Sequence, residues 1–142
     1  MWISLAYNDK TTMKTLRLLL PVCLAVTPFL FAAEDPSPEH VKLMKEMGSL
    51  NGKLRKGEDV EASAKRMAEL GATALVSWQK RSPEVGASSL KNLIIASNMV
   101  AAASANKDAE KVTDGLKMLG GACKSCHDAH REKVGEGEYK IK

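Results

Sequence analysis

From Ser37 onward, apolar residues recur at intervals of three and four positions in four successive segments, with helix breakers between them. No segment shows the alternation that is typical of a strand. We expect helices over about 37–57, 59–79, 84–106 and 108–133. Because short turns between helices of similar length favour antiparallel neighbours, the pattern predicts an all-α, up-down-up-down antiparallel four-helix bundle.

The helix starts carry local signals. Ser37 can accept the free amide hydrogens of the first turn, and Pro38 follows where its missing donor costs nothing. The same Ser-Pro-Glu order returns at Ser82, which predicts a second helix start there, and Gly57 supplies a stop for the first helix. Beyond Gly135 the tail lacks periodicity, so we expect it to be loose.

The expected core is short of large side chains. Aromatic residues make up only 4% of the chain, and many inward positions hold Ala or Gly. In the last segment the inward row includes two cysteines: Val112, Leu116, Leu119, Cys123, Cys126 and His130. A bound planar cofactor is one way to fill such a core.

The first part of the chain has the features of a secretory signal peptide. A positive stretch begins at Met13, an apolar run covers 18–33, and cleavage is expected after Ala32 or Ala33. The run is shorter than the roughly 20 residues of a membrane span. We therefore expect an upstream extension and signal over 1–33, a domain over 34–142, a periplasmic location, loss of Cys23 and no stable membrane span after signal removal.

The charge of the chain argues against nucleic-acid binding. The formal net charge is +4, and removal of 1–33 takes away three positive charges and one negative charge, which leaves about +2. That excess is too small for a nucleic-acid partner.

One five-residue motif carries specific chemistry: Cys123-Lys124-Ser125-Cys126-His127. This spacing is the pattern for covalent attachment of haem c. On a helix the two cysteines lie one turn apart on the same side, so both thiols can reach the two vinyl groups of one porphyrin. The adjacent His127 can then bind the iron. We expect one covalently attached haem c.

Three other uses of the cysteine pair fit less well. A thioredoxin-like pair belongs at the start of a helix beside a strand. A zinc site needs further ligands, and the chain offers only His40 and His130. A disulfide between residues three apart on a helix has poor geometry.

With this motif late in a predicted four-helix bundle, the chain from about Ser37 to Lys133 resembles the class II c-type cytochromes, the cytochrome c-prime family and its low-spin relatives. The resemblance matches Arg131 to a family arginine four residues after the ligand histidine, and its guanidinium can in part replace the propionate contact that is lost with the family arginine at His40. His130 departs from the usual Tyr or Phe. The resemblance also makes Met44 the candidate sixth iron ligand, with His40 where the family has an arginine. The alternatives are Met47, His40 or an empty sixth position, with Met44 a core residue.

The resemblance implies a one-electron carrier between periplasmic redox partner proteins, with His127 and Met44 on the iron. The alternative is a five-coordinate protein that binds NO or CO on an open distal face. Neither is an enzyme, and we expect no enzymatic activity; a third, weaker alternative is a peroxidase-like enzyme with His40 or His130 as acid or base. Many family members dimerise through their first two helices, so a homodimer is one state that the resemblance allows.

Overall fold

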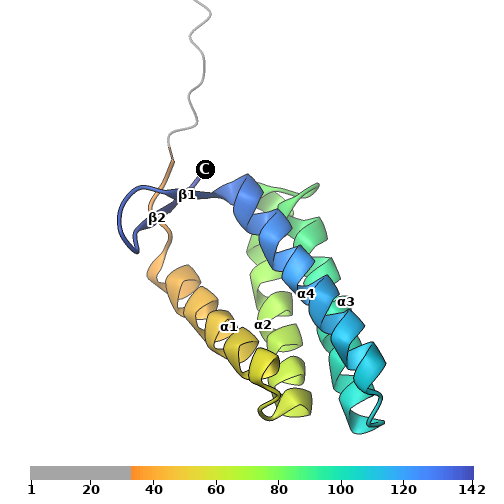
Figure 1. Ribbon diagram of the computed structural model, residues 1–142. Helices are drawn as coiled ribbons and strands as arrows, with labels where there is room; N and C mark the ends of the chain where they lie inside the picture. Colours follow the sequence, from red (N-terminus) through yellow and green to blue (C-terminus); the bar gives the residue numbers. More distant parts are fainter. Residues whose placement is uncertain (1–32) are drawn as a thin grey trace, which may run out of the picture. The chain divides into compact units, whose positions relative to one another are not determined.

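The computed structural model describes residues 33–142, so the expectations for the signal segment and Cys23 lie outside the described residues. Four helices account for most of this part: α1 (Pro38–Lys56), α2 (Val60–Arg81), α3 (Gly86–Ala105) and α4 (Ala109–His130). The predicted all-α four-helix bundle is confirmed. The chain turns back at each connection between helices (Figure 1).

The first helix begins and ends where its local signals predict. The His40 amide donates to Ser37 Oγ at 3.2 Å, and Pro38 occupies the first turn. At the other end, Gly57 closes α1 with φ 74°, a left-handed conformation that costs glycine little.

The third helix begins later than the second Ser-Pro-Glu signal predicts. Pro83, Glu84 and Val85 form a turn, and α3 starts at Gly86. Ser82 still acts as a local cap, because its Oγ accepts a hydrogen bond of 3.0 Å from the Gly86 amide. The signal therefore marks the turn correctly but not the first helical residue.

The core lies mainly along α2 and α3. Buried side chains from all four helices form one cluster, whose fully buried members include Leu54, Met67, Val100 and Leu119. Close approach depends on small residues: an added Cβ at Gly115 would lie 2.5 Å from Val100 Cγ2. The predicted inward faces of the second and third helices are confirmed by the burial of Met67, Trp78, Leu93 and Val100 among others.

Among the described helices, neighbours in sequence pack together, and α2 and α3 share the largest interface. By contrast, α1 and α4 have almost no backbone contact with each other. The backbones of α1 and α4 are therefore more widely separated than those of consecutive helices, which leaves an open seam between the two backbones.

The C-terminal tail is not loose, contrary to expectation. The fourth helix ends at His130 rather than Lys133, and a two-stranded antiparallel hairpin follows: β1 (Arg131–Lys133) and β2 (Tyr139–Ile141). Ile141 also pairs with Glu34 ahead of α1, with two hydrogen bonds of 2.8 Å. This pairing joins segments far apart in sequence, which periodicity cannot detect.

Within residues 33–142, no helix combines the length and the apolar character needed to cross a membrane.

Candidate functional site

The cysteine-histidine motif lies in the last two turns of α4. Gly115, Leu119 and Ala122 bury one face of this helix. Above them, Ser89 of α3 is 5% exposed and donates through Oγ to Ser125 Oγ at 3.2 Å. This hydrogen bond links the motif to α3. The side chains of Cys123, Cys126 and His127 remain half-buried.

Both thiols are free and held in their neutral form. Burial raises the pKa of Cys123, although the nearby Arg55 guanidinium opposes the effect. Burial also raises the pKa of Cys126, and Cys123 adds to the rise. A thiol of low pKa is the mark of a thioredoxin-like redox pair. The surroundings of Cys123 and Cys126 instead raise the pKa of both thiols.

His127 is held neutral as well. Burial lowers the pKa of its imidazole, and the positive charge of Arg131 lowers it further, against a smaller opposing effect from Asp128. Because a metal ion binds the neutral ring, this environment suits His127 to ligation.

A cavity of about 820 Å³ opens beside the motif. Its volume falls within the range of about 300–1,000 Å³ that is usual for small-molecule and cofactor sites. The lining comes from α1, α4 and the hairpin: Arg55, Gly120, Cys123, Lys124, His127, Asp128, Arg131, Lys133 and Tyr139. Cys126 is not part of the lining.

Positive charge exceeds negative charge around this cavity. Asp128, the one carboxylate of the lining, pairs with Lys124. Among residues 33–142, no carboxylate pairs with Arg55, Arg131 or Lys133. The Cys123 thiol, the neutral His127 imidazole and the unpaired cations are groups of the kinds that a haem c requires as a thioether anchor, an iron ligand and propionate partners, while the second thiol, Cys126, lies outside the lining.

Because the hairpin follows α4 directly, Arg131 does not lie in the helix that the sequence predicts. This residue is the first of β1 rather than part of a helix, and its guanidinium lies 3.7 Å from the centre of the Tyr139 ring. Arg131 also lines the cavity with His127.

Met44 does not line the cavity. It is half-buried on α1 and packs against the core cluster. The rings of His40, Trp78 and His130 form an aromatic layer, against which the positions of Met44 and His127 along their helices can be compared. Trp78 lies 6.0 Å from the ring of His40 and 4.9 Å from the ring of His130, between centroids.

Met44 and His127 each lie about one helical turn from the aromatic layer, on the side away from the hairpin. Met44 follows His40 by four residues, about 6 Å along α1, and His127 precedes His130 by three residues, about 4.5 Å along α4. Met44 and His127 therefore lie at a similar level on the two helices that border the open seam.

Two cavity residues, Arg55 and Tyr139, were missed by the sequence analysis. Arg55 follows Met44 by eleven residues, about three helical turns, so both lie on one side of α1, but this spacing alone does not indicate a role for Arg55. Tyr139 lies in the segment that was expected to be loose, and nothing local to it indicates a pairing with β1.

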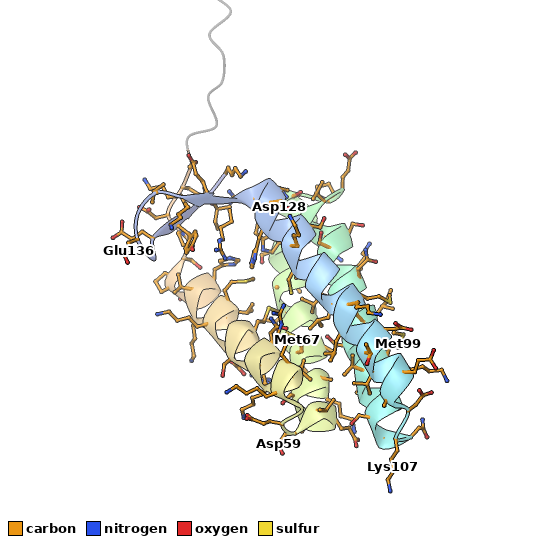
Figure 2. The ribbon with its side chains drawn as sticks, viewed as in Figure 1. Asp59, Met67, Met99, Lys107, Asp128 and Glu136 are labelled. Atoms are coloured by element: carbon orange, nitrogen blue, oxygen red, sulfur yellow. The ribbon has the colours of Figure 1, made fainter. Side chains whose placement is uncertain are left out.

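Figure 2 shows where this end of the molecule lies relative to the turns. Asp128 is close to the C-terminal end of α4 and Glu136 is at the tip of the hairpin, whereas Asp59 and Lys107 mark turns at the opposite end of the helices. The cavity therefore extends from the hairpin, with Lys133 and Tyr139, toward Arg55 near the C-terminal end of α1.

The chain matches no protein-family model, no curated protein and no solved structure among the known proteins with which it was compared. Its function is therefore inferred from the residues of the site.

Proposed function

We propose that this chain is a monohaem cytochrome of the class II c type that carries single electrons between periplasmic proteins. The observation that carries the proposal is the position of Cys123 and His127 of the attachment motif at one cavity, with Cys126 one turn from Cys123 on the same helix. The signal-like segment at 1–33 supports export to the compartment where this attachment takes place.

Bound haem supplies an iron that changes its charge by one electron. In the proposal, Cys123 and Cys126 form thioether bonds to its vinyl groups, and His127 gives the iron a neutral imidazole nitrogen. Because burial keeps all three side chains uncharged, no desolvated charge has to be neutralised when the group is held.

The unpaired cations of the lining are the proposed partners of the propionates. Arg55 and Arg131 each present a planar guanidinium that can bind a carboxylate with two parallel hydrogen bonds. Arg55 lies in the last turn of α1, whereas His40, at the position of the family arginine, lies in its first turn.

Met44 is the proposed sixth ligand. It lies at the level of His127 across the open seam, and the thioether of methionine opposite a histidine raises the reduction potential, which suits a carrier. No catalytic residue is proposed, since neither His40 nor His130 lines the cavity.

A second candidate function is binding of NO or CO by a five-coordinate iron. The observation that favours it is that Met44 packs against the core and does not line the cavity. In that case the distal face of the haem has no protein ligand, and a small gas can bind there directly.

Absorption spectra of the exported protein separate the two functions. We expect a low-spin ferric spectrum that becomes high-spin in Met44→Ala and is unchanged in the control Met118→Ala, which alters an exposed methionine of α4. A high-spin spectrum of the unaltered protein, unchanged in Met44→Ala, combined with fast CO binding after reduction, would rule out Met44 ligation and support the gas-binding function.

A further inference from the structure

The C-terminal hairpin forms part of the cavity wall. Arg131, Lys133 and Tyr139 line the cavity together with Cys123 and His127 (Figure 2 shows the hairpin beside the end of α4). Tyr139 brings an aromatic ring to a lining that otherwise consists largely of charged side chains. The hairpin therefore forms one part of the wall of the cavity that Cys123 and His127 also line.

Several contacts outside the hairpin hold it in this place. Its second strand pairs with Glu34 through Ile141, and Ile141 packs against the hydrophobic core. The Lys142 amide donates to the His130 carbonyl at 3.0 Å, and Lys142 Nζ donates to the Asp128 carbonyl at 2.9 Å. The hairpin is thus anchored both to the segment before α1 and to the last turn of α4.

The Tyr139 ring itself has a specific partner. The Arg131 guanidinium lies 3.7 Å from the ring centroid, a cation–π contact between the two strands. Because Arg131 directly follows the last turn of α4, the ring is fixed relative to His127, four residues earlier.

We propose that Tyr139 is a positioning residue of the haem site: its ring, held by Arg131, forms part of the wall of the cavity that Cys123 also lines, and keeps water from the attached group. This inference rests on the proposed function. Exclusion of water raises the reduction potential of a haem, because a less polar surrounding disfavours the more highly charged ferric state. Tyr139 therefore helps to set the potential without touching the iron.

The first test needs no haem. In the full-length apoprotein, alkylation of Cys123 by iodoacetamide is followed by peptide mapping, which separates Cys123 from the other cysteines. We expect Tyr139→Ala to speed alkylation of Cys123 several-fold, Tyr139→Phe to leave it unchanged, and Cys126, which does not line the cavity, to respond less.

The second test uses the protein with haem attached. Tyr139→Ala should shift the midpoint potential to a more negative value, and Tyr139→Phe should restore the original value because the ring is retained. Val134→Ala is the matched control, since Val134 lies in the same hairpin, is 49% exposed and does not line the cavity.

The outcomes distinguish this inference from the proposed function. Equal alkylation rates in Tyr139→Ala and the unaltered protein would overturn the inference, and so would an equal acceleration in Val134→Ala. Far-ultraviolet circular dichroism shows whether each variant keeps its helices. If no haem is attached, the proposed function fails while the alkylation test still decides whether Tyr139 covers Cys123.

Discussion

Individual residues at the hairpin end of the bundle are placed by burial and by neighbouring charge. Trp78 is 5% exposed and lies between His40 and His130, while the Arg81 guanidinium lies 5.6 Å from its ring. His130 Nε2 is buried without a hydrogen-bond partner among the described residues. Protonation of either histidine would therefore place a positive charge in a poorly solvated site.

The partly buried positions of His40 and His130 beside Trp78 predict how the stability of the apoprotein depends on pH. Burial, and then Arg81, lower the pKa of His40 below its ordinary value of 6.5, so the unfolded chain binds a proton in a pH range where the folded chain does not. Stability of the apoprotein should fall as the pH drops through 6.5. His127 and His130 are shifted in the same direction.

Urea unfolding of the apoprotein at neutral and mildly acidic pH measures this effect. We expect the midpoint to fall on acidification, and to fall less in His40→Gln, which cannot take up the proton. A variant that loses as much stability as the unaltered protein would show that His40 does not contribute to the pH dependence.

Single residues also show what local sequence can predict. The Ser37 cap and the Gly57 stop depend on a few adjacent residues, and both are found where the sequence predicts them. The motif residues were identifiable for the same reason. Arg55 and Tyr139 were not, because they reach the cavity only through contacts between distant segments.

At the scale of elements, the contact between α3 and α4 determines which face of α4 is left for the cavity. Gly115 sits against α3 so closely that a Cβ there would lie 2.5 Å from Val100 Cγ2 and 3.2 Å from Met99 Cε. Val100 is fully buried and cannot move aside easily.

Alanine substitutions in α4 test this packing. Gly115→Ala gains up to ~1 kcal/mol of helix propensity but costs about 1–3 kcal/mol from overpacking, so we expect a lower melting temperature. Gly121→Ala in the same helix meets no atom within 4 Å and should raise the melting temperature by a few degrees. Equal changes in the two variants would contradict the close α3–α4 contact.

The hairpin is the element that the sequence analysis missed. Periodicity detects a helix because its contacts are local, whereas β1 and β2 pair across a loop and with Glu34 about a hundred residues away. The helix end at His130 follows from the same pairing, since Arg131 is in extended backbone with φ −113° and ψ 124°.

For the whole molecule, the four-helix fold could be predicted because breakers and apolar spacing agree along the entire domain. The open seam between α1 and α4 could not, because it depends on how the helices pack rather than on where they begin. This seam brings Met44 and His127 to a similar level on facing helices, and the proposed function depends on it.

The most direct measurement is the intact mass of the chain expressed together with the haem-ligation machinery and exported. We predict the mass of the processed chain plus one haem, lost in a variant in which both Cys123 and Cys126 are replaced by alanine. An unmodified apoprotein mass under these conditions would contradict the claim that these cysteines bind haem.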